Sequence, residues 1–115
     1  LSKIKNIIFL YYMSHYLKPD GKLYELSHKQ IGYVKTDGKV YNVMHKQLGY
    51  AKTDGKVYNV MHKQLGYIKP DGKIYNVVHK HIENISNIEK KIKDSRHIKS
   101  YILLAVYNFL IKPIF

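Results

Sequence analysis

The stretch "GYVKTDGKVYNVMHKQL", residues 32–48, is followed directly by "GYAKTDGKVYNVMHKQL", residues 49–65, with a single change from Val34 to Ala51. Looser copies flank this pair as "HYLKPDGKLYELSHKQI" at 15–31 and "GYIKPDGKIYNVVHKHI" at 66–82. The period is therefore 17 residues in a chain of 115. Tandem similarity at a fixed period predicts one small structural unit that is stacked on copies of itself.

Every copy contains a strong turn signal, written "KPDGK" at 18–22 and 69–73 and "KTDGK" at 35–39 and 52–56. Pro or Thr suits the first turn position, Asp suits the second, and Gly takes the left-handed position that follows. The pattern predicts a hairpin with a three-residue loop, a type I turn closed by a glycine bulge. In that register Val34 faces Val40 and Tyr33 faces Tyr41, and all four copies pair aliphatic with aliphatic and Tyr with Tyr.

The residues after each hairpin predict a second turn and a returning strand. In the second copy they read "NVMHKQLGY", which is long enough for a turn near His45 and Lys46 and a return to Tyr50. The four units then form an antiparallel meander of about eight short strands, so the predicted fold class is mainly β.

Alternation along the strands leaves neither face of this sheet polar throughout, because Tyr and Lys share one face while Val, Gly and Met share the other. Such a sheet must be covered or must close on itself. We expect a closed ring or toroid of four hairpins, a single-layer curved sheet covered by the chain ends, or a dimer joined at sheet edges.

The C-terminal segment, residues 83–115, is predicted to be helical. Four isoleucines at spacings of three and four form an amphipathic stripe: Ile82, Ile85, Ile88 and Ile92. A second helix is expected over 98–111, capped by Asp94 or Ser95 and ended by Pro113. Its apolar run favours burial against the sheet, and it is too short for a bilayer, which needs about 20 residues.

The N-terminal segment, residues 1–14, gives a weak targeting signal. Basic residues precede a seven-residue apolar run from Ile7 to Met13, the lower limit for a signal peptide, and no small-residue cleavage site follows. We therefore expect a cytoplasmic protein, with secretion left open. Because Met13 stands just before the first repeat, the sequence also leaves open whether residues 1–12 are native.

The chain is strongly basic, with a net charge of +12. This balance favours polyanionic partners such as nucleic acid. All but one of the 20 basic residues are Lys, however, and an excess of Lys with Ile, Asn and Tyr also fits an AT-rich coding sequence. The absence of cysteine excludes disulfides and thiolate metal sites.

Residues for catalysis are scarce. Half of the eight acidic residues are turn aspartates, namely Asp20, Asp37, Asp54 and Asp71, and the rest are scattered. The seven glycines lie in the repeats, so no glycine-rich phosphate loop exists. We expect a protein that is not an enzyme and has no cofactor.

One histidine recurs in every repeat, always followed by lysine: His28, His45, His62 and His79. In a closed ring these imidazoles could converge on the axis and bind a transition metal. Alternatively, His-Lys is a polar turn pair that points into water. The sequence leaves this choice open, and we assign no metal ligands.

The tyrosines and lysines of the last three hairpins form the candidate binding surface: Tyr33, Lys35, Lys39, Tyr41, Tyr50, Lys52, Lys56, Tyr58, Tyr67, Lys69, Lys73 and Tyr75. Aromatic rings that stack on bases, beside lysines that neutralise phosphates, are typical of single-strand binders. The alternative is that the rings pack under the helices while the lysines keep the hairpin tips soluble.

The unit "GYVKTDGKVYN" resembles the short aromatic hairpin repeats of bacterial cell-wall-binding and choline-binding modules. The likeness covers residues 15–82 and rests on the motif "GY…DGK…Y". It implies recognition of glycan or choline between successive hairpins, with Tyr33, Tyr41 and their equivalents in the aromatic positions.

The sequence thus predicts a non-catalytic repeat module that uses a multivalent Lys and Tyr surface. A polyanion such as nucleic acid is the first candidate ligand, bound through several weak and equivalent patches. We also expect a homo-oligomer, and we do not expect a membrane as a partner. The alternatives are a purely structural, self-associating repeat protein without a small ligand and a cell-wall glycan-binding module.

Overall fold

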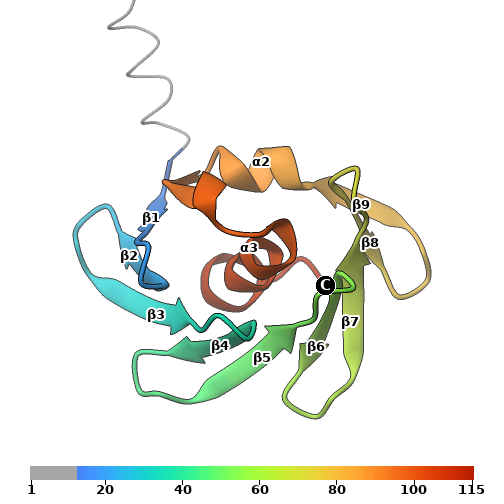
Figure 1. The fold of residues 1–115 in the computed structure, drawn as a ribbon, viewed down its shortest axis with the longest axis horizontal. Coiled ribbons are helices and arrows are strands. Elements are labelled where there is room, and N and C mark those ends of the chain that lie inside the picture. Colours follow the sequence, from blue (N-terminus) through green and yellow to red (C-terminus); the bar gives the residue numbers. More distant parts are fainter. Residues whose placement is uncertain (1–12) are drawn as a thin grey trace, which may run out of the picture.

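The computed structural model describes residues 13–115, which form a mainly β fold with a helix at its centre (Figure 1). The strands are β1 His15–Leu17, β2 Lys22–Glu25, β3 Gln30–Val34, β4 Lys39–Asn42, β5 Gln47–Ala51, β6 Lys56–Asn59, β7 Gln64–Ile68, β8 Lys73–Asn76, β9 His81–Asn84 and β10 Ile92–Lys93. The helical elements are α2 Ile85–Glu89, the short 3-10 turn η1 Ser95–His97, α3 Ser100–Val106 and its π-helical continuation η2 Tyr107–Ile111.

All ten strands belong to one sheet that curves around the central helix. The strands β1 to β9 follow one another as an antiparallel meander, and β10 pairs in parallel with the outer side of β1. The strands β9 and β10 are therefore the two edges, and α2 lies in the gap between them (Figure 1). The sheet is not closed by strand pairing, so the curved sheet covered by the chain end, and not the closed ring, is the structure that forms.

The predicted register is confirmed in every repeat. Val34 pairs with Val40 and Tyr33 with Tyr41, and the other copies pair in the same way. In the second repeat the N–H of Gly38 donates to the carbonyl of Lys35, as the type I turn requires. Gly38 adopts the left-handed φ of 89°, which glycine reaches without a steric penalty.

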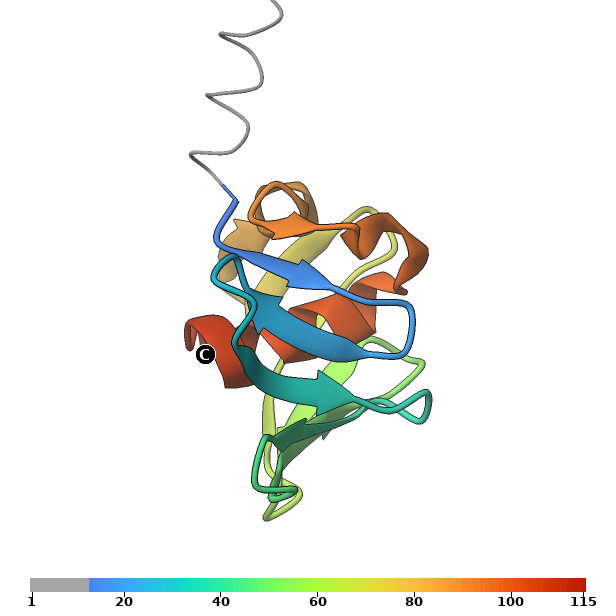
Figure 2. The ribbon, with the colours of Figure 1, turned by 90° about the vertical axis from the view of Figure 1, so that its left-hand side faces the viewer.

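The core lies between the inner face of the sheet and the helix α3–η2. The aliphatic hairpin pairs are buried, with Val40 and Val57 fully so, and the helix contributes the buried run 102–107. Figure 2 shows β1, β2 and β3 side by side with the helix behind them. Each fully buried aliphatic side chain contributes about 1.5–3 kcal/mol relative to an exposed one.

Three repeat glycines leave room for the end of the helix and the residues after it. A Cβ at Gly49 would overlap the ring of Phe109, one at Gly66 the ring of Phe115, and one at Gly32 the side chain of Leu110. In the "GY" pair of the repeat, Tyr therefore faces the outside of the sheet. Gly faces the inside, where the absence of a side chain leaves space for the helix.

The last residues fold back on the helix through Asn108, which is buried. Its Oδ1 accepts hydrogen bonds from the backbone N–H groups of Ile114 at 2.8 Å and Phe115 at 3.3 Å. These bonds satisfy a buried polar side chain and hold Phe115 over Gly66.

The segment 83–115 is helical only in part. The helical stripe predicted from Ile82 to Ile92 is wrong, because Ile82 lies in β9, Ile92 lies in β10 and only Ile85–Glu89 between them is helical. The unpaired edge of β8 offers backbone hydrogen bonds that extend the sheet through these residues.

The predicted cap of the last helix is also wrong. The helix begins at Ser100 with Lys99 as its N-cap residue, whereas Asp94 and Ser95 precede the separate turn η1. The end before Pro113 is confirmed, since η2 stops at Ile111. No helix within residues 13–115 is long and apolar enough to cross a membrane.

We expect Gly49→Ala to destabilise the protein by about 1–3 kcal/mol, because the added methyl group overpacks the site held by Phe109. Urea unfolding followed by circular dichroism measures this loss. Thr53→Ala in an exposed turn is the control and should change stability by less than about 0.5 kcal/mol. A G49A protein as stable as the control would show that Phe109 is not held against this strand.

Candidate binding surfaces

Each repeat contains two turns with the same backbone form. We call 18–21, 35–38, 52–55 and 69–72 the glycine turns, and 25–28, 42–45, 59–62 and 76–79 the histidine turns. The histidine turns place His28, His45, His62 and His79 in the left-handed region, with φ between 65° and 72°. This conformation costs a residue with a Cβ about 1–2 kcal/mol, so an interaction of the side chain must account for histidine at this position.

The imidazole makes that interaction with a tyrosine twelve residues earlier. Nδ1 of His45 is hydrogen-bonded to the hydroxyl of Tyr33 at 2.9 Å, and the other repeats form the same bond at 2.8–3.0 Å. Asn42 completes the turn, because its Oδ1 accepts the N–H groups of Met44 and Lys46. The histidine thus joins its turn to the hairpin of the same repeat.

The tyrosines of each hairpin stack on one another on the outer face. Ring centroids of the four pairs are 5.0–5.3 Å apart and the ring planes differ by only 8–14°. Lysine Nζ atoms lie 4.6–5.0 Å from the centroid of the second ring, a cation–π distance. The centroid of the histidine ring lies 5.7–6.0 Å from that of the first tyrosine.

These contacts order four side chains as lysine, tyrosine, tyrosine and histidine, which we call a tyrosine stack. In the second repeat the order is Lys35, Tyr41, Tyr33, His45. Both the lysine Nζ and the other tyrosine ring lie close to Tyr41, and the histidine ring lies close to Tyr33. The tyrosines are half-buried and lie outside the core, so the alternative that they pack under the helices is wrong.

Nine of the twelve sequence-predicted site residues belong to these stacks: Tyr33, Lys35, Tyr41, Tyr50, Lys52, Tyr58, Tyr67, Lys69 and Tyr75. The remaining three, Lys39, Lys56 and Lys73, begin the strands after the glycine turns. The first repeat supplies a fourth stack that the predicted set omits, made of Tyr16, Lys18, Tyr24 and His28. The constant spacing of twelve residues between Tyr and His is the sequence signal for it.

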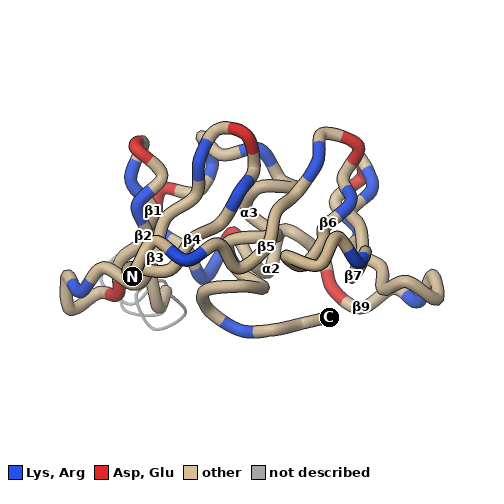
Figure 3. Tube along the Cα trace, turned by 90° about the horizontal axis from the view of Figure 1, so that it is seen from below, with Lys and Arg blue, Asp and Glu red and all other residues tan. Residues whose placement is uncertain are grey.

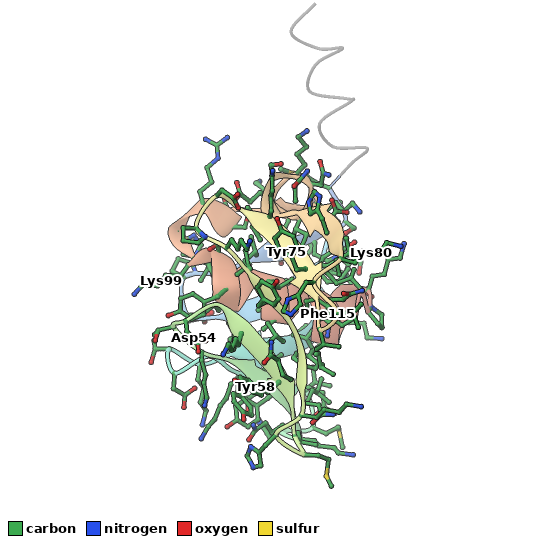
Figure 4. All side chains as sticks on the ribbon, turned by 90° about the vertical axis from the view of Figure 1, so that its right-hand side faces the viewer. Asp54, Tyr58, Tyr75, Lys80, Lys99 and Phe115 are labelled. Carbon is green, nitrogen blue, oxygen red and sulfur yellow. The ribbon has the colours of Figure 1, made fainter. Side chains whose placement is uncertain are left out.

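The glycine turns project from one end of the molecule. Figure 3 shows these tips, acidic residues between lysines, on one side and the C-terminal end on the other. Figure 4 agrees, because Asp54 and Lys99 lie toward one side while Lys80 and Phe115 lie toward the opposite side. The lysines beside the glycine turns are therefore gathered around the start of α3, where Lys99 adds a further charge.

A hollow of about 690 Å³ lies at this end, between the first two glycine turns and the start of the helix. Its lining includes Pro19, Lys35, Thr36, Lys99 and Tyr101. Within residues 13–115 only Lys39 forms an ion pair, with Asp37 at 3.9 Å, and both side chains are about half exposed. The other lysines in and beside the glycine turns form no ion pair within these residues, so their charge is available to a partner.

Two groups near the sheet edges have shifted pKa values, and both lie outside the tyrosine stacks. Burial lowers the pKa of His15, and the Glu25 carboxylate partly offsets this effect. Burial alone would raise the pKa of Glu83, but hydrogen bonds from Asn87 and the backbone of Asn84, with the charges of Lys91 and His81, hold that pKa below its ordinary value.

The recurring histidines do not converge. Each is held by the tyrosine of its own stack on the outside of the sheet. Across the described part of the chain, no three His, Asp or Glu side chains form a group that could hold a metal ion.

The fold and these surfaces define a protein of tandem β-hairpins arranged around a central helix. The family described as "5-fold beta-flower protein" matches residues 10–105, which is most of the chain, and the chain belongs to that family. No curated protein and no solved structure matches the chain.

The family match corrects the resemblance to cell-wall-binding and choline-binding repeats, which is wrong. The shared motif "GY…DGK…Y" serves a different arrangement here. Gly32 and its equivalents make room for the end of the helix, and the tyrosine rings stack on one another. The glycan ligand that this resemblance implied loses its support.

The description "5-fold" suggests a pentameric assembly. This agrees with the expected self-association, for which the sequence predicted no number of subunits. Nothing in the family description bears on nucleic acid.

We expect His45→Gly to be more stable than His45→Ala by about 1 kcal/mol. Both variants lose the bond to Tyr33, but only alanine keeps a Cβ in the left-handed conformation. Chemical denaturation of the two variants side by side measures the difference. Equal stabilities would show that the turn relaxes away from the left-handed region when the imidazole is removed.

Proposed function

We propose that this protein is a non-catalytic binding module for polyanions such as nucleic acid, and that the lysines in and beside the glycine turns carry the binding. The observation behind this proposal is the placement of these turns on one side, around the start of α3 (Figure 3). Each repeat adds a lysine on either side of its turn, for example Lys35 and Lys39. The resulting surface carries positive charge across several hairpins, as binding to a repetitive phosphate backbone requires.

The tyrosines take a supporting role in this proposal. A base that stacks on a protein ring needs a free ring face, and in the second repeat Tyr41 already stacks on Tyr33 and has the Nζ of Lys35 near its ring. The tyrosine stack instead holds the charged Nζ of the lysine near an aromatic ring on the outer face of the sheet. We therefore expect binding that depends on charge and not on base sequence.

Repetition supplies affinity that one turn lacks. A single exposed lysine gives a weak, strongly hydrated point contact. Four turns on one rigid sheet place several such contacts on one linear partner, so the later contacts form at high effective concentration. The near-identity of the second and third repeats keeps these contacts equivalent.

The triple variant K39Q/K56Q/K73Q tests the proposal, with fluorescence anisotropy on a labelled single-stranded oligonucleotide at several salt concentrations. We expect weaker binding to all sequences alike and a salt-dependence slope smaller by about 2, because each contact with a single strand contributes about 0.7 to that slope.

Two matched variants serve as controls in the same assay. K46Q/K63Q/K80Q removes the same charge beside the histidine turns, and Y33F/Y50F/Y67F removes three hydroxyls but no ring. Both should bind like the unmodified protein. Equal losses from the two lysine variants would reject the glycine turns as the site, and failure of the unmodified protein to bind at low salt would reject the proposal.

We infer self-association as a second property, because the family description suggests five like parts. A homo-oligomer of five chains is one arrangement. The other lies within a single chain, in which four hairpin repeats and a fifth sector, β9–α2–β10, surround α3 (Figure 1). Light scattering after size exclusion distinguishes them, since a pentamer has five times the chain mass of 13.6 kDa. A single-chain mass over the accessible concentration range would reject the oligomer.

A further inference from the structure

The histidine turns expose apolar side chains where turns normally carry polar ones. Met44 is 80% exposed, Met61 81% and Val78 75%, and the residue before each of them is an exposed valine. Single exposed apolar residues are common on protein surfaces, but here the same two turn positions are apolar in three successive repeats.

The glycine turns provide a comparison within the same chain. Both kinds of turn have the same hydrogen-bond pattern, and the last residue of each is left-handed. The backbone thus makes the same demands on both, yet the glycine turn of the second repeat carries Thr36 and Asp37 where its histidine turn carries Val43 and Met44. Neither turn geometry nor solubility accounts for Val and Met, which points to a partner that covers them.

Further apolar surface lies at the same end of the molecule. The end of the helix and the tail after it rest against Gly49 and Gly66, which are strand residues on the histidine-turn side of the repeat. Phe109 and Phe115 are only partly buried there. In Figure 4 Phe115 and Lys80 lie toward the same side, away from Asp54. The exposed turn residues therefore surround a partly apolar centre.

The charges at the last three histidine turns are positive. A lysine follows each histidine, and the three turns with exposed apolar pairs contain no acidic residue over 42–46, 59–63 and 76–80. The first histidine turn differs, because it begins with Glu25 and carries Leu26 and Ser27. A second copy of the same surface would bring lysine against lysine, and a nucleic acid would leave the Val and Met side chains without a partner.

We propose that the histidine-turn end docks on an anionic lipid surface. The exposed Val and Met side chains enter the boundary between headgroups and acyl chains, while the neighbouring lysines contact the anionic headgroups. The protein lies on the bilayer and does not cross it, and the glycine turns at the opposite end stay free in water. Several shallow contacts act together in this mode, so no single turn needs a deep insertion.

The chain contains no tryptophan, so one introduced tryptophan reports on one site. The test compares Met44→Trp with Thr36→Trp, which place the probe in the two turns of the same repeat. Each is titrated with phosphatidylcholine vesicles with and without 30% phosphatidylserine. We expect a blue shift and protection from acrylamide quenching for M44W with the anionic vesicles, and no change for T36W.

A co-sedimentation experiment with the same vesicles gives an independent measure. M44S/M61S/V78S should reduce the bound fraction at least tenfold, whereas T36A/T53A should leave it unchanged. The two tryptophan variants and these two variants are first checked by circular dichroism for the unmodified fold.

Three outcomes would overturn the proposal. One is a M44W spectrum that does not respond to anionic vesicles. Another is an equal response from T36W, because it would show that the protein binds lipid through its overall positive charge and not through the histidine-turn end. The third is a blue shift of M44W that rises with protein concentration in the absence of vesicles, because it would make a second copy of the chain the partner.

Discussion

The structure depends on one constraint, the left-handed residue that ends each hairpin loop. Gly38 and His45 take this position in the two turns of the second repeat, and both close a turn of the same length. Because side chains alternate along a strand, a loop of fixed length decides which residues face the core. A shift by one residue would put Tyr33 inside and Val34 outside, and the central helix would have no apolar surface to contact.

The central helix is the second requirement. A meander of short hairpins has an apolar inner face that it cannot bury alone, and α3–η2 fills the space that the curved sheet surrounds. Glycine in the middle of β3, β5 and β7 makes this packing possible, since a side chain at Gly49 or Gly66 would meet an aromatic ring. Repeat and helix are therefore matched to each other residue by residue.

The same repeat presents different chemistry at its two ends. The glycine turns combine Asp and Lys, which suits water and charged partners, whereas the histidine turns combine exposed Val and Met with Lys. Between these ends, the tyrosine stack of each repeat joins its hairpin to the histidine turn that follows it. Both proposed surfaces depend on repetition, because several copies of a weak contact can bind one partner together without a deep pocket.

The sequence by itself determined the hairpin, its register and the meander, because these depend on turn chemistry and on contacts between residues close in the chain. Only the tertiary structure decided what lies against each face. The isoleucines from Ile82 to Ile92 have helical spacing, but the free edge of β8 draws His81–Asn84 into the sheet. The packing of Phe109 against Gly49 likewise joins residues that are far apart in the chain, and a linear pattern does not contain such a contact.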